Sequence, residues 1–163
     1  MNRETLVLLA AGLAEAYFLW RLLYYVLSMR HLDPWRGYSW DAIKFVAKRL
    51  ANEPEGLTIA LGPIEQESFL FPIGGKYEPT TQTIYIETRL VRTPRRLIKV
   101  LLHEICHHNQ CVDGRAGFGH RGWYWTQPIE MEARAFARAW GGVALRMYNA
   151  VSRRTGNRQS DTF

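Results

Sequence analysis

The feature that most constrains this chain is a pair of histidines four residues apart, His103 and His107, in a stretch with the local signs of a helix. Thr93 followed by Pro94 is a typical helix start, because threonine caps free backbone N–H groups and proline fits the first helical position. The predicted helix runs to about Gln110. Since residues four apart share a helix face, the two imidazoles should point into one cleft while the opposite, apolar face packs on a core.

The two histidines frame the motif His103-Glu104-Ile105-Cys106-His107, which has the pattern H-E-x-x-H. Two imidazoles at this spacing can occupy two corners of a zinc tetrahedron. Glu104 is rotated by about 100° from His103 around the helix axis, so it should reach a water at the open position rather than the ion. There it would act as a general base and then a general acid. A capped amphipathic helix behind a strand is the context that this motif requires.

A catalytic zinc needs a third protein ligand and leaves one position for water. The downstream candidates are Glu132, His120, Glu130 and Asp113. A helix is predicted from Pro128 to about Val151, and its large apolar residues define the expected buried stripe: Ile129, Phe136, Trp140, Val143 and Met147. At about 100° per residue, Glu132 lies nearer the centre of this stripe than Glu130 does. We therefore predict Glu132 as the third ligand, and Glu130 as an ion-pair partner of Arg134.

The segment from Leu6 to Leu27 is almost continuously apolar and is interrupted only by Glu15 and Arg21. A helix of this length could cross a hydrocarbon layer of about 30 Å, and the arginines that follow would place the remaining chain on the cytoplasmic side. A carboxylate within a membrane is costly, so a core helix of a soluble protein is the alternative. We expect a cytoplasmic protein, with residues 6–27 as a membrane anchor in the first case.

The segments between these helices predict a small sheet. Ser39 or Asp41 can cap a helix from Ala42 to about Leu50. Short strands are predicted at Leu57–Leu61, Ser68–Pro72 and Thr83–Glu87, the last alternating between apolar and polar faces as a half-buried edge strand does. The 163 residues suffice for one compact domain. We predict an apolar helix over residues 1–31, an α+β domain with a small mixed sheet over 32–151, and a polar tail over 152–163.

The formal net charge of +6 includes a basic run without acidic residues, made of Arg89, Arg92, Arg95, Arg96 and Lys99. Such a run is ordinarily a solvated face, although it could meet phosphates or an anionic membrane surface. No zinc-finger, RNA-recognition or basic-zipper pattern accompanies it, so we expect no nucleic-acid partner. Two cysteines, Cys106 and Cys111, are too few for a disulfide framework, and free thiols in a reducing compartment are the simpler interpretation.

Three segments together resemble a known family. The stretch Gly75-Lys76-Tyr77-Glu78-Pro79-Thr80-Thr81-Gln82-Thr83-Ile84-Tyr85-Ile86, the H-E-x-x-H motif, and Glu132-Ala133-Arg134-Ala135-Phe136-Ala137 are similar to segments of the minimal gluzincins. These are small thermolysin-like zinc peptidases that include repressor-cleaving members. The resemblance spans about Leu57 to Gly142. It implies a minimal zincin fold with an active-site helix, a glutamate-bearing helix and a substrate-lining edge strand, here Thr83–Glu87. The chain has no recognisable DNA-binding module.

The sequence therefore predicts a zinc endopeptidase that hydrolyses a protein or peptide substrate, with Zn²⁺ held by His103, His107 and Glu132 and with Glu104 as the acid–base group. An oxyanion or substrate contact is expected from His120, Tyr124 or Tyr148. The alternative is a zincin-fold protein without turnover, such as an assembly or virion component. The presence of Glu104 favours the enzyme, because a structural zinc site does not need that carboxylate.

Overall fold

The computed structural model describes residues 38–64, 73–115 and 127–160, side chains of 156–160 excepted, and scattered positions between 5 and 23. The chain divides into two units, Met1–Asp33 with Glu65–Pro72, and Pro34–Ile64 with Ile73–Phe163. The expected apolar helix at 6–27 and the expected strand at 68–72 lie largely outside the described residues. No helix in the described part of the chain is both long and apolar enough to span a membrane.

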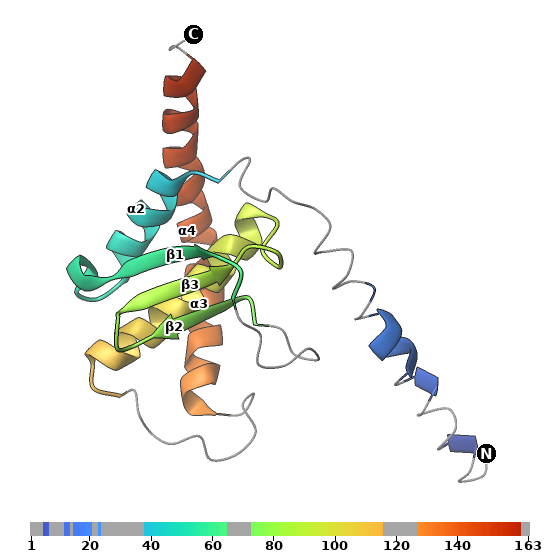
Figure 1. Cartoon of the computed structure of the whole chain (residues 1–163). Coiled ribbons are helices and arrows are strands. Elements are labelled where there is room, and N and C mark those ends of the chain that lie inside the picture. The colour runs from blue at the N-terminus through green and yellow to red at the C-terminus, as the bar shows by residue number, and fades with distance from the viewer. Residues whose placement is uncertain are drawn as a thin grey trace. The chain divides into compact units, whose positions relative to one another are not determined.

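The larger unit is an α+β structure built on a small mixed sheet (Figure 1). Its strands are β1 (Thr58–Gly62), β2 (Gly75–Glu78) and β3 (Thr83–Glu87), in the order β1-β3-β2. Strand β3 pairs in parallel with β1 and antiparallel with β2, so that Ile84 faces Ile59 on one side and Tyr77 on the other. The predicted β1 and β3 are confirmed to within one residue.

The structure corrects the expected sheet edge. Thr83–Glu87 was predicted to be an edge strand, but β3 is the central strand of the three described, and only Tyr85 is exposed along it. The edge nearest α3 (Pro94–Val112) is β2, at a position where the glycine pair Gly74-Gly75 indicates a turn. Gly75 is needed there for close approach, because a Cβ at this position would lie 2.6 Å from the Val100 side chain.

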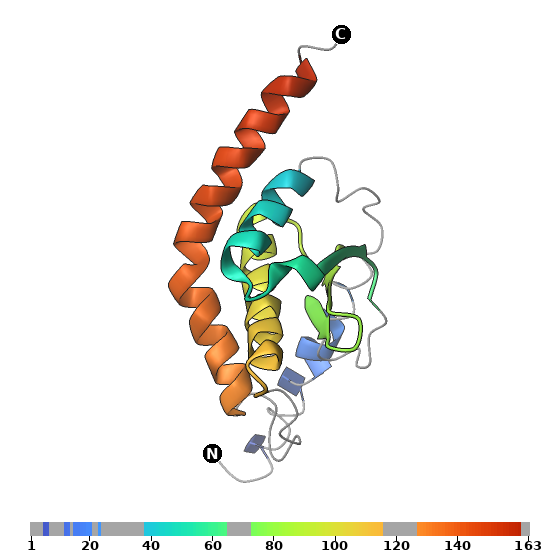
Figure 2. The ribbon, with the colours of Figure 1, turned by 90° about the vertical axis from the view of Figure 1, so that its left-hand side faces the viewer.

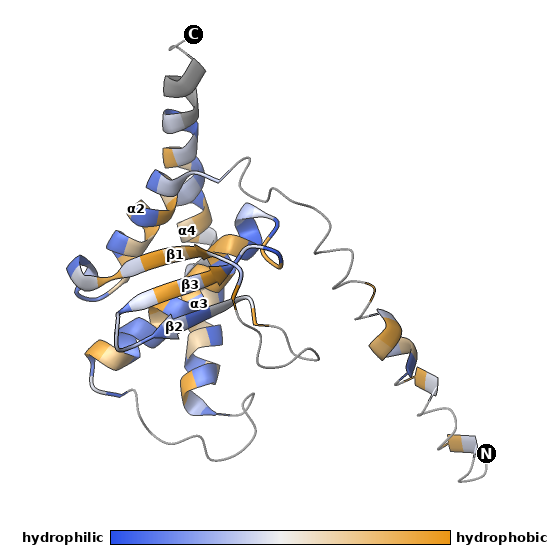
Figure 3. Ribbon diagram, viewed as in Figure 1, coloured by the Kyte–Doolittle hydropathy of each residue, from blue (hydrophilic) through white to orange (hydrophobic). Residues whose placement is uncertain are grey.

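Two predicted helices are confirmed together with their caps. Helix α2 (Trp40–Leu50) begins after Ser39, whose side chain accepts the Ala42 N–H. Helix α3 begins after Thr93, whose side chain accepts the Arg96 N–H, and Pro94 occupies its first turn. The short 3-10 turn η1 (Pro54–Gly56) leads from α2 into β1. Capping and a one-sided apolar pattern are local properties, and they placed these helices correctly. Figure 3 shows the mixture of apolar and polar residues along α2.

Helix α3 lies between the sheet and the long helix α4 (Pro128–Ser160), as the two views show (Figures 1 and 2). One apolar core joins these layers. It is formed by Ile43 and Val46 of α2, Ile84 and Ile86 of β3, and the buried leucines and isoleucines of α3. Because α3 contributes its apolar face to both neighbours, the remaining strip of its surface, which carries His103 and His107, is left half-buried.

Helix α4 differs from its prediction in its buried face and in its length. Its buried face carries Glu130 and a row of small residues with Tyr148, not the large apolar stripe: Ala133, Ala137 and Ala144 are buried, whereas Trp140 is 41% exposed. Alanines allow α4 to lie close to α2 and α3. The helix also continues through the predicted polar tail to Ser160, and the Thr155 hydroxyl makes a hydrogen bond of 3.1 Å with Ser39 Oγ.

Candidate metal centre

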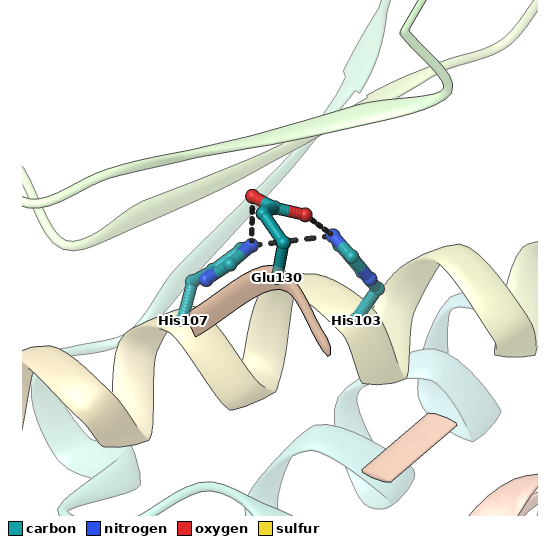
Figure 4. A group of neighbouring side chains, drawn as sticks. All are labelled: His103, His107 and Glu130. Atoms are coloured by element: carbon teal, nitrogen blue, oxygen red, sulfur yellow. Dashed lines mark hydrogen bonds and ion pairs between the residues drawn. The ribbon is translucent and has the colours of Figure 1, made fainter. Parts of the chain in front are cut away.

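Three side chains from two helices converge where the start of α4 meets α3. His103 and His107 project from successive turns of α3, and the carboxylate of Glu130 lies over both rings (Figure 4). Glu130 Oε2 is 3.3 Å from His103 Nε2, and Glu130 Oε1 is 3.3 Å from His107 Nε2. The two histidines are half-buried and Glu130 is buried. These three groups lie within metal-binding distance of one another.

The spacing of the two imidazoles suits a tetrahedral ion. Their Nε2 atoms are 3.2 Å apart, and the ring planes are nearly perpendicular, at 87°. A zinc ion with ligands at about 2.0–2.1 Å in a tetrahedron has corners about 3.3 Å apart. The same separation holds for each imidazole nitrogen and the Glu130 oxygen that faces it. These two separations involve different oxygens of Glu130, and one ligand atom from each of the three residues lies within 4.8 Å of the other two. The three side chains are therefore close enough to hold one ion together.

Gln110 fixes which nitrogen of His107 faces the cluster. The Gln110 amide nitrogen donates to the Ile129 carbonyl at 3.1 Å and to Glu132 Oε2 at 2.9 Å, so its amide oxygen is the atom that faces His107. That oxygen can only accept, at 2.9 Å from His107 Nδ1. His107 therefore donates from Nδ1 and presents Nε2 toward Glu130. This is the outer partner that metal-binding histidines usually have.

The carboxylates of Glu104 and Glu130 favour positive charge at His107, and Arg134 supplies positive charge beside Glu130. Burial alone would lower the pKa of His107, but hydrogen bonding to Glu130 and the charge of Glu104 outweigh it and raise the pKa. Arg134 Nη1 lies 3.8 Å from Glu130 Oε2, in the i,i+4 arrangement predicted from the sequence. Positive charge beside Glu130 therefore comes from Arg134 in this structure, and an ion bound among the three ligands would add to it.

Glu104 is buried next to the histidines but is not part of the cluster of three. Burial raises the pKa of Glu104 to about 6, opposed by the nearby histidines and by a backbone hydrogen bond from Tyr77. Strand β2 lies directly against it, because a Cβ on Gly75 would be 3.0 Å from the Glu104 carboxylate oxygen. The edge strand thus confines this carboxylate on the side of α3 next to the imidazoles.

The structure corrects the choice of carboxylate on α4. Glu130, not Glu132, lies beside the histidines, while the Glu132 side chain is 46% exposed and binds Arg115 at 2.9 Å. The alternative ligand Asp113 is exposed and pairs with the same arginine at 3.0 Å. The prediction of Glu132 was wrong because it located the buried face of α4 from its large apolar residues, whereas alanines form that face. Hydrogen bonds from Gln110 and Arg115 lower the pKa of Glu132 and keep it ionised outside the cluster.

The expected oxyanion and substrate contacts are not brought to the cluster in the described part of the chain. His120 and Tyr124 lie outside the described residues. Tyr148 is buried, and its hydroxyl accepts the Ser39 N–H at 3.0 Å, so it joins α4 to the start of α2. Cys106 and Cys111 are free thiols, as predicted, and burial raises the pKa of Cys106 to about 11.

A buried histidine next to the motif stabilises the site and was not anticipated from the sequence. His108 Nε2 is 2.6 Å from the Asn52 carbonyl oxygen, which can only accept, so Nδ1 accepts from the Tyr77 hydroxyl at 3.1 Å. These two bonds join α3 to β2 and to the segment after α2. A histidine that follows H-E-x-x-H carries no sequence signal for this role, because its partners lie 31 and 56 residues away.

Comparison with protein-family models, curated protein sequences and solved structures finds no match to this chain. The resemblance to minimal gluzincins therefore stays a prediction from the quoted motifs. The site is characterised instead by its own geometry: two imidazoles from one helix, one carboxylate from the next, and a buried glutamate beside them.

Proposed function

We propose that this chain is a zinc-dependent peptidase whose ion is held by His103, His107 and Glu130. The observation that supports this most is the convergence of those three groups. The two imidazole nitrogens are 3.2 Å apart, close to the edge of a zinc tetrahedron, and each lies 3.3 Å from one of the two oxygens of Glu130. Two nitrogen ligands and one carboxylate form the ligand set of many catalytic zinc sites, which keep a fourth position for water or substrate. Calcium and magnesium prefer sites made of oxygen ligands.

The role of Glu104 distinguishes a catalytic site from a structural one. When bound, zinc supplies Lewis acidity toward a substrate carbonyl and a water molecule. Glu104 takes a proton from the water molecule while the water oxygen attacks the carbonyl carbon. It then passes this proton to the leaving nitrogen when the C–N bond breaks. Burial against β2 keeps the carboxylate in place for both transfers. Gln110 holds His107 in the required orientation.

The test uses the purified full chain and three single substitutions. Zinc content is measured by elemental analysis, and cleavage is measured on a mixture of quenched fluorescent peptides. Glu130→Gln should lose zinc and turnover together. Its matched control, Glu132→Gln, lies two residues along α4 and should keep both. Glu104→Gln should retain one zinc per chain and lose turnover, because its carboxylate is not a ligand.

Two results would contradict the proposal. Equal zinc content in wild type and Glu130→Gln would remove Glu130 from the ligand set. Wild-type protein with one zinc per chain that cleaves no peptide in the mixture would favour the alternative, a zincin-fold protein with a structural or regulatory role.

A further inference from the structure

The first turns of α3 carry exposed cations. Arg95, Arg96 and Lys99 are exposed, while Leu97, Ile98 and Leu101 are buried on the opposite side. Within the described residues, none of these three cations forms an ion pair with a carboxylate. Arg89, which precedes them, is already bound to Glu87 at 2.7 Å. The exposed cations are therefore available to a ligand.

Two of these cations lie on the helix face that carries the metal centre. At about 100° per residue, Arg96 is rotated from His103 by about 20° and Lys99 by about 40°. At 1.5 Å per residue, Lys99 lies about 6 Å and Arg96 about 10 Å from His103 along the axis. The two exposed cations and the two half-buried imidazoles thus lie along one side of α3.

The placement of these cations does not serve the fold. The amino end of a helix is the positive end of its dipole, where cations are unfavourable. The other end of the same surface carries no excess of positive charge, because Arg115 pairs with two carboxylates, Asp113 and Glu132, beyond His107. With zinc bound, the charges of Glu104 and Glu130 are also offset. Among the described residues of α3, the cations without a carboxylate partner therefore lie on the amino-terminal side of His103.

We propose, on the basis of the proposed function, that the site takes acidic peptides and that Arg96 and Lys99 bind substrate carboxylates on one side of the scissile bond. An extended peptide advances about 3.3 Å per residue. The two cations thus match side chains roughly two to four residues from the bond. A flat anionic membrane on this face would cover the centre, whereas an extended chain can lie along α3 and enter it.

The experiment measures binding separately from cleavage. The zinc-loaded full chain carrying Glu104→Gln is titrated against two labelled peptides of equal length, one with glutamates at alternate positions and one with glutamines in their place. Fluorescence anisotropy should show binding of the acidic peptide about tenfold tighter, with the difference lost at high salt. Arg96→Glu with Lys99→Glu should abolish the preference. The matched reversal on α2, Lys44→Glu with Lys48→Glu, should leave it intact.

Zinc content and thermal midpoint are measured on every variant, so that loss of folding is recognised. Equal binding of the two peptides, or an equal effect of the two double reversals, would overturn the inference. So would reversal-sensitive binding to phosphatidylserine vesicles without discrimination between the peptides. If wild-type protein prefers acidic peptides but cleaves none, the proposed peptidase function is wrong and the proposed binding surface stands. If it cleaves peptides without a charge preference, the peptidase function stands and the binding surface is wrong.

Discussion

Replacement of Gln110 by leucine tests the residue that orients His107 and leaves all three candidate ligands unchanged. Gln110 is buried, and its side chain makes three hydrogen bonds, to His107 Nδ1, the Ile129 carbonyl and Glu132. Leucine has a similar size but cannot accept from His107, so the imidazole loses its fixed orientation. Removal of such an outer partner costs about 10–100-fold in metal affinity. This corresponds to about 1.4–2.7 kcal/mol of binding free energy.

The measurement is zinc affinity by competition with a chromophoric chelator, together with the visible spectrum of the cobalt-substituted protein. Gln110→Glu restores an acceptor for His107 but sets a carboxylate against Glu132, so it should recover most of the zinc affinity while lowering the free energy of unfolding. Glu132→Ala removes one partner of Gln110 and leaves the bond to His107, so its affinity should stay close to wild type. Unchanged zinc affinity in Gln110→Leu would refute the orienting role.

Two further predictions concern the support of the sheet. Hydrogen bonds from Arg89 and Ile64 outweigh burial and lower the pKa of Glu87. The ionised carboxylate therefore stabilises the folded state above the ordinary carboxyl pKa, and this stabilisation is lost as the pH falls through the lowered pKa. In denaturant titrations, Glu87→Gln should therefore destabilise the protein by about 1.5–3 kcal/mol at pH 7, and by less near pH 3. Gly75→Ala sets a Cβ 2.6 Å from Val100 and should cost about 1–3 kcal/mol in thermal unfolding; an unchanged midpoint would show that β2 shifts freely.

The parts of the fold that the sequence predicted are those governed by local chemistry. Thr93 and Pro94 define the start of α3, and the apolar spacing behind them defines its buried face, so the histidine pair could be placed on a helix without the structure. The same holds for Ser39 and α2. Capping and periodicity involve residues a few positions apart, which is the range over which sequence patterns can be interpreted.

The predictions that were wrong, the edge strand and the carboxylate on α4, depend on contacts between distant segments. The edge position of β2 follows from its pairing with β3 and from the approach of Gly75 to α3, neither of which is visible in a Gly-Gly pair. The choice of Glu130 over Glu132 depends on how α4 rotates against α3. Hydrophobicity favoured Trp140 as a buried residue, but close helix packing favoured the alanines. A small-residue pattern, Ala133, Ala137 and Ala144, was the signal that could have located the face.

Under the proposed function, the alanine face of α4 has a consequence for which ion the site would select. Ala133 is fully buried on α4, one turn beyond Glu130. A larger side chain at this buried position would need extra space, so α4, which carries Glu130, would have to shift. First-row ions differ in preferred geometry more than in the ligands they accept. A residue that touches no ion can therefore retune metal preference during evolution while every ligand is kept.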